Sequence, residues 1–153
     1  MTGRCFADTN LFLYAASKDP ADARKKAVAR TLLENEDIGI SAQVLQEFAH
    51  NATAKQRLGL KADETEAILR SLLEYPVLPV TGELVLEAFN VQQRYQIAYW
   101  DAAIVAAARK LGCETLFSED LNPGQDYGGV VVRNPFASAF RPVAASHFPR
   151  RTA

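Results

Sequence analysis

Two acidic residues follow short apolar runs and are the first candidates for chemistry in this sequence. Asp8 comes directly after the run CFA at 5–7, and Asp120 follows the run TLF at 115–117 in the same manner. Each run has the length and composition of a buried strand. Because open parallel sheets bind ligands beyond the carboxyl ends of their strands, we expect Asp8 and Asp120 to share one edge of the molecule.

A third acid, Asp101, stands in the segment YWDAAIVAAARKLG. At helical periodicity Ile104, Val105 and Ala108 fall within about 60° of Asp101 around the axis, so its carboxylate is central to the apolar stripe. An ionised carboxylate buried alone is costly, and it normally becomes neutral or finds a partner. The helix N-terminus offsets only ~0.3–1 kcal/mol of that cost. We therefore expect Asp101 to have a partner.

Two glutamates are weaker candidates. Glu47 borders the apolar stripe of the predicted helix SAQVLQEF, and Glu119 precedes Asp120 in LFSED. Either Glu119 or Asp120 is a candidate for the acid after the TLF strand. Taken singly, each acid also has an ordinary interpretation as a turn residue, a helix N-cap or a solvated surface group.

The acids are candidate metal ligands. No Lys or Arg in the neighbouring motifs is placed to pair with them, and several carboxylates together raise one another's pKa unless a cation bridges them. Mg²⁺ and Mn²⁺ are hard ions that accept such oxygen ligands. The only histidines, His50 and His147, are isolated and form no cluster with cysteine, which argues against zinc. No Ser–His–Asp or Cys–His set is evident either.

Short apolar runs alternate with amphipathic segments along the chain, which predicts an α/β fold with a parallel sheet covered on both faces. A capping box formed by Asp63 and Glu66 is expected to start one helix, which reaches about Tyr75. Asp19, Ser41 and Thr81 are expected N-caps of other helices. The expected strands are 5–7, 38–40, 77–80, 115–117 and 130–133, and the expected helices are 10–17, 20–35, 41–58, 63–75, 82–95 and 99–111.

The bulk composition is that of an ordinary globular protein. The chain has 153 residues, 17 Lys and Arg against 18 Asp and Glu, and a net charge of −1, which argues against a non-specific DNA coat. Cys5 and Cys113 are expected to be buried, reduced side chains. There is no apolar run long enough to cross a membrane, so a cytoplasmic protein is expected. We expect one domain at 1–136 and a C-terminal tail at 137–153.

The ordered motifs DTN, SAQVLQEF, YWDAAIVAAA and SED, followed by GQDYGGV and NPF, resemble a PIN domain. More closely, the chain resembles the VapC-type ribonuclease toxins of bacterial toxin–antitoxin pairs, over roughly residues 4–136. The resemblance implies a three-layer α/β/α sandwich around a central parallel sheet. It also implies carboxylates that gather Mg²⁺ or Mn²⁺ at the strand ends. Ser118 stands where threonine is commoner in the family.

Carried over motif by motif, the resemblance implies site residues for each position. Asp8 and Asp101 are the foremost metal ligands, and the others bind the ion directly or through water. Asn10 and Ser118 are polar supports. The full implied catalytic set is Asp8, Glu47, Asp101 and Asp120, with Glu119 kept open as the fourth acid.

The implied activity is metal-dependent endoribonuclease cleavage of phosphodiester bonds by a metal-activated water, leaving a 5′-phosphate and a 3′-hydroxyl. The implied partners are RNA, a cognate VapB-like antitoxin and a second copy in a homodimer, with no membrane. The alternative is a catalytically weak PIN-like module that acts by binding a partner or nucleic acid. An aspartyl phosphatase is disfavoured because position 10 holds Asn10 instead of a second Asp, and a phospho-acceptor receiver is disfavoured by the single acid in FADTN.

Basic side chains are candidate phosphate contacts, although each is more often a solubilising charge on a helix surface. They are Arg24, Lys25, Lys26, Arg30, Lys55, Arg57, Lys61, Arg94, Arg109 and Lys110.

Overall fold

The structure, a computed structural model, describes residues 3–137. Its centre is a five-stranded sheet in the order β3-β2-β1-β4-β5, with every pair parallel. The tail expected at 137–153 lies, except for Ala137, outside the described residues. The strands are β1 (Cys5–Ala7), β2 (Ile38–Ser41), β3 (Val77–Leu78), β4 (Thr115–Phe117) and β5 (Val131–Arg133), and the α-helices are α1 (Thr9–Ala16), α2 (Ala23–Asn35), α3 (Ala42–Ala54), α4 (Ala62–Leu72), α5 (Gly82–Tyr95) and α6 (Tyr99–Lys110).

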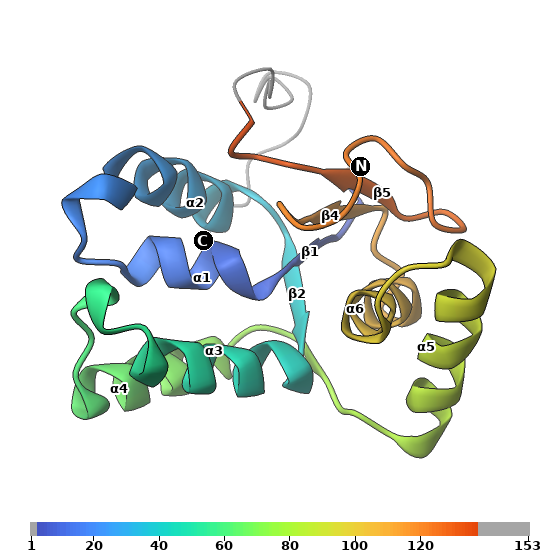
Figure 1. The fold of residues 1–153 in the computed structure, drawn as a ribbon, viewed down its shortest axis with the longest axis horizontal. Coiled ribbons are helices and arrows are strands. Elements are labelled where there is room, and N and C mark those ends of the chain that lie inside the picture. Colours follow the sequence, from blue (N-terminus) through green and yellow to red (C-terminus); the bar gives the residue numbers. More distant parts are fainter. Residues whose placement is uncertain (1–2, 138–153) are drawn as a thin grey trace.

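Helices cover the sheet on both sides, which confirms the expected α/β/α sandwich. Figure 1 shows α5 and α6 on one side and α1 to α4 on the other. Both faces of β1 and β2 are buried, and their residues are apolar except for Ser41 at the end of β2. Within residues 3–137, no helix combines the length and the apolar composition that a membrane span requires.

The strand order changes direction between β1 and β4. From β1 the chain moves to β2 and then β3 on one side, and it returns through α5 and α6 to place β4 and β5 on the other side. The backbone N–H of Asp8 donates to the carbonyl of Phe117 at 3.0 Å, so the residues that follow β1 and β4 are direct neighbours. This is the switch point at which open parallel sheets bind ligands.

Helix α6 is buried on every side and not along one stripe. All residues from Ala102 to Ala108 are buried, because α6 lies between the sheet and α5 and its small alanine side chains allow close packing. The expectation of a single apolar stripe was therefore too narrow. Asp101 escapes full burial because it stands in the first turn, where the helix reaches the sheet edge; it is half-buried.

Several local expectations were confirmed and some were wrong. The side chain of Thr81 caps α5 as expected, whereas Asp19 caps a 3-10 turn at Pro20–Asp22 and α2 itself begins at Ala23. The Asp63–Glu66 capping box was wrong: α4 begins at Ala62, and it is the side chain of Glu64 that accepts the backbone N–H of Lys61, at 3.2 Å.

The predicted C-terminal ends of α3, α4 and β3 also differ from the structure, and α3 ends at Ala54 instead of at residue 58. Helix α4 ends at Leu72 and not near Tyr75, and the chain then turns toward β3. Strand β3 stops before Pro79, which has no N–H to extend the ladder. Ser41 precedes α3, but its buried hydroxyl makes no capping hydrogen bond in the described structure.

Candidate active site

Asp8 is the most deeply buried of the candidate acids, with 6% of its surface exposed. It ends β1 and caps α1, and this position fixes its side chain. Oδ1 accepts the backbone N–H of Thr9 at 2.7 Å, and Oδ2 accepts the hydroxyl of Ser118 at 2.9 Å. Burial raises the pKa of Asp8, these two hydrogen bonds lower it, and the charges of Glu47 and Asp120 raise it; together they give a pKa of about 7.

Asp120 is tied to the same centre through two supports, Ser118 and Asn10. Its backbone N–H donates to Oγ of Ser118 at 3.2 Å, so Ser118 contacts both Asp8 and Asp120. The side-chain amide of Asn10 donates to Oδ2 of Asp120 at 3.2 Å. The structure thus places both residues that the resemblance implied as supports between the ends of β1 and β4.

Glu47 lies on α3 at the border of its apolar stripe and is half-buried. Nε2 of Gln43 donates to Oε1 of Glu47 at 2.8 Å and to the carbonyl of Trp100 at 3.2 Å. Burial raises the pKa of Glu47, and the charges of Asp101 and Asp120 add to that rise. Gln43 therefore connects α3 to the start of α6, where Asp101 stands.

Sequence reasoning missed Gln43. The available signal was its spacing, because residues four apart on a helix share a face and Gln43 precedes Glu47 by that interval.

Asp101 completes the group of four carboxylates. Burial and the charge of Asp120 both raise its pKa. Between described residues, no ion pair involves Asp8, Glu47, Asp101 or Asp120. The four acids therefore repel one another without a protein cation to compensate, and an all-oxygen donor set of this kind suits a hard divalent ion.

The four acids form a loose cluster. Within residues 3–137, no three Asp, Glu, His or Cys side chains are close enough together to form a ready-made metal site. Electrostatic interactions couple the four carboxylates, and Ser118 is a contact that Asp8 and Asp120 share.

Glu119 belongs to a separate network of contacts. Oε1 of Glu119 accepts the hydroxyl of Tyr14 at 2.7 Å, and Oε2 pairs with Nζ of Lys25 at 3.0 Å. Nζ of Lys25 also donates to the Tyr14 hydroxyl at 3.0 Å. The expectation that no Lys or Arg pairs with the candidate acids was therefore wrong for Glu119. The sequence hid this pair because α2 brings Lys25 from 94 residues away.

The basic side chains proposed as phosphate contacts are mostly occupied within the fold. Arg24 donates to the backbone carbonyl of Phe136. Lys26 donates to the carbonyl of Ser17, and Arg30 to the carbonyl of Ala15. These contacts hold α2 against the rest of the molecule and leave fewer cations for a ligand.

Comparison with known proteins gives the same fold and a family. The sequence profile of the PIN domain matches residues 5–124. A search of curated proteins returned no match.

Solved structures of low sequence identity share the fold. A toxin–antitoxin complex from Klebsiella pneumoniae is similar with a TM-score of 0.63 and 19% identity, over 86% of this chain and 98% of that one. VapC20 of Mycobacterium tuberculosis, a toxin that cleaves the sarcin–ricin loop, has a TM-score of 0.58 and 24% identity over 76% of this chain and 91% of that one. VapBC2 from Rickettsia felis, bound to a DNA fragment from its promoter, has a TM-score of 0.59 and 18% identity. The match covers 85% of this chain and 97% of that one.

The profile match spans β1 through β4 and includes all four clustered carboxylates. The parallel sheet and its strand-end acids agree with that match. The chain belongs to the PIN domain family.

Proposed function

We propose that this protein is a metal-dependent endoribonuclease and the toxin of a toxin–antitoxin pair. The observation that carries the proposal is the set of four carboxylates at the β1–β4 switch point. Burial and mutual repulsion raise the pKa of Asp8, Glu47 and Asp101, and no ion pair within the described chain offsets that repulsion. Family membership and the toxins of the same fold support the assignment.

Asp8 and Asp101 would hold Mg²⁺ or Mn²⁺, with Glu47 and Asp120 binding directly or through water. When bound, the ion lowers the pKa of a water molecule and offsets charge on the phosphodiester. Asp8, with a pKa of about 7, must release a proton to bind a cation at neutral pH. Ser118 orients Asp8, Gln43 orients Glu47, and Asn10 orients Asp120.

Cleavage of RNA by the metal-loaded protein tests this proposal. Protein stripped with EDTA is supplied with Mg²⁺, Mn²⁺ or neither, and the cleavage of total RNA is followed. Cleavage is expected only with an ion, and Asp8→Asn and Asp101→Asn are expected to abolish it. A wild-type protein that binds a partner tightly but cleaves no RNA with either ion would instead support a PIN-like binding module.

The partners expected from the resemblance are also part of the proposal: a VapB-like antitoxin and a second copy, both acting in the cytoplasm. The solved structures from Klebsiella pneumoniae and Rickettsia felis contain such toxin–antitoxin assemblies. Val85, Leu86 and Phe89 form an exposed apolar face on α5, which supports a protein partner there. Sedimentation of wild type and Phe89→Glu tests the homodimer, which the variant is expected to weaken.

A further inference from the structure

A cavity of about 280 Å³ adjoins the carboxylate cluster. Asn10 and Asp120 form the wall that it shares with the cluster, and Lys55 and Arg57 lie on the wall that α3 and the turn after it provide. The cavity therefore lies beside the position that a reacting phosphate at the carboxylates would occupy.

The charges that line the cavity are mostly compensated. Glu119 pairs with Lys25, as described above. Arg57 pairs with Asp22 at 2.7 Å and with Asp19 at 3.3 Å, and Asp22 is itself fixed by the hydroxyl of Ser17. These pairs hold the wall in place and leave little charge for a ligand.

Lys55 is the exception on this wall. It lies at the C-terminal end of α3 and is exposed, and among the described residues it forms no ion pair and no side-chain hydrogen bond. Its ammonium group is the cation that the cavity can offer to an anion that approaches from the cluster.

We propose that this cavity binds a backbone phosphate of the RNA strand next to the bond that is cleaved, and that Lys55 makes the contact. The inference deepens the proposed function and rests on it. A stacked base fits the cavity less well, because the aromatic ring of Tyr14 is already covered. The centroids of the Tyr14 and Phe136 rings are 4.9 Å apart in an edge-to-face arrangement, and Nζ of Lys25 lies 4.6 Å from the centroid of the Tyr14 ring. The hydroxyl of Tyr14 donates to Glu119. Base binding needs an open aromatic face, whereas a phosphate needs a cation.

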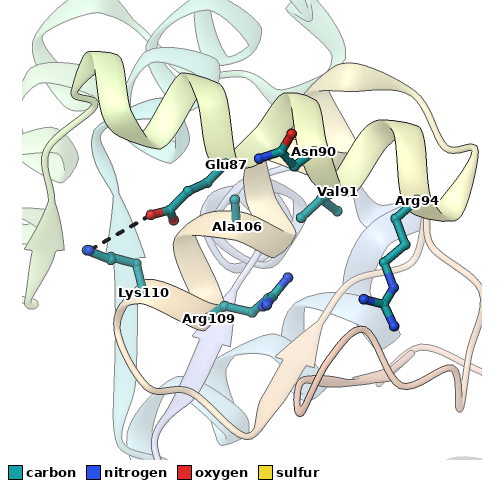
Figure 2. A pocket seen from close by; sticks show the side chains of 7 residues that line it. All are labelled: Glu87, Asn90, Val91, Arg94, Ala106, Arg109 and Lys110. Atoms are coloured by element: carbon teal, nitrogen blue, oxygen red, sulfur yellow. Dashed lines mark ion pairs between the residues drawn. The ribbon is translucent and has the colours of Figure 1, made fainter.

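A more basic cavity lies elsewhere and does not adjoin the cluster. Figure 2 shows it between α5 and α6, with Arg94, Arg109 and Lys110 around it and Glu87 facing Lys110. Arg109 stands in the last turn of α6 and Asp101 in the first, about 12 Å away along the helix axis. The guanidinium of Arg109 lies against the backbone of Gly128, and Lys110 is 3.9 Å from Glu87. A phosphate there would lie far from the reacting bond.

The test separates RNA binding from cleavage. A fluorescent single-stranded RNA is titrated with protein in EDTA, so that no cleavage occurs, at several salt concentrations. Lys55→Gln is expected to weaken binding several-fold at low salt and to reduce the slope of log K against log salt by about 0.7, the value for one phosphate contact on a single strand. Lys55→Arg is expected to keep the wild-type slope.

Arg70→Gln is the matched control. It also removes one positive charge, but from an exposed position on α4 where Arg70 pairs with Glu66, outside the cavity. It is expected to leave the slope unchanged. In cleavage assays, Lys55→Gln is expected to raise KM and leave kcat near the wild-type value, because Lys55 binds the substrate away from the reacting atoms.

The outcomes distinguish this inference from the proposed function. If wild type cleaves RNA and Lys55→Gln binds with the same affinity and slope as Arg70→Gln, the phosphate site is wrong and the nuclease assignment stands. If Lys55→Gln reduces the slope but wild type cleaves nothing with Mg²⁺ or Mn²⁺, the phosphate site stands and the nuclease assignment is wrong.

Discussion

The hydroxyl of Ser118 donates a 2.9 Å hydrogen bond to Oδ2 of Asp8, across 110 residues of sequence. Both groups are almost completely buried. This contact joins the end of β4 to the end of β1 and favours the charged form of Asp8, because the hydrogen bond opposes the rise in pKa that burial causes.

Removal of this hydroxyl is expected to change the titration of Asp8. In Ser118→Ala the carboxylate loses a hydrogen-bond donor, so its pKa is expected to rise above the wild-type value of about 7. Carbon-13 NMR of the Asp8 carboxyl in metal-free protein measures the change. Ser118→Thr restores the hydroxyl and is expected to return the pKa toward wild type. An unchanged pKa in Ser118→Ala would show that the contact does not control Asp8.

The stability of the metal-free protein is expected to depend on the ionisation of Asp8. Its pKa is about 7 in the fold against 3.8 in the unfolded chain, so the folded state binds the extra proton between these values. The contribution of Asp8 to the free energy of unfolding is therefore fully present below about pH 4. It is lost as pH rises through about 7, by up to about 4 kcal/mol. Urea unfolding from pH 4 to 8 measures this loss.

The variant Asp8→Asn isolates that contribution. It cannot ionise, so without metal it is expected to avoid the loss of up to about 4 kcal/mol in free energy of unfolding that wild type shows between pH 4 and pH 8. A parallel pH dependence in wild type and Asp8→Asn would contradict the assignment of the loss to Asp8.

Divalent ions are expected to stabilise the protein by binding between the carboxylates. At an ion concentration of one hundred times Kd, the free energy of unfolding rises by about 2.7 kcal/mol. Thermal unfolding with Mn²⁺, Mg²⁺ or EDTA measures the effect, which Asp101→Asn is expected to reduce strongly. Equal shifts in wild type and Asp101→Asn would place the ion elsewhere.

The identity of the fourth acid is testable by comparison of two neighbours. Asp120→Asn is expected to reduce RNA cleavage by about 10–100-fold, the usual cost of disturbing a group around a metal. Glu119→Gln is expected to keep cleavage within about threefold, because Glu119 is already paired with Lys25 and bonded to Tyr14. Unfolding curves for both variants check that neither loses its fold. A larger loss in Glu119→Gln would reverse the assignment.

Gln43 is expected to act by positioning Glu47. Gln43→Ala removes the 2.8 Å hydrogen bond to Glu47, so the pKa of Glu47 is expected to rise and cleavage to fall by about tenfold. The pH profile of cleavage is expected to shift to higher pH as the pKa of Glu47 rises, which a purely structural defect would not cause. Gln46→Ala, an exposed glutamine on the same helix, is the control and is expected to match wild type.

The amino-acid sequence determined the layered fold and most of the candidate acids. Short apolar strands alternate with amphipathic helices, and this pattern gives a parallel sheet covered on both faces. Asp8 and Asp120 follow strands at their carboxyl ends, and that local position predicted their shared edge, which the hydrogen bond between Asp8 and Phe117 confirms. Such inferences succeed because strand ends and helix faces are set by residues close together in sequence.

Only the tertiary structure decided which partner each side chain meets. Lys25 comes from α2 to neutralise Glu119, Gln43 connects α3 to the start of α6, and Lys55 reaches the cavity beside Asp120 without a partner among the described residues. These relationships join distant segments, and their geometry depends on how the helices pack around the sheet. The residue types showed that carboxylates were present, but the packing decided which remain uncompensated and therefore available to an ion.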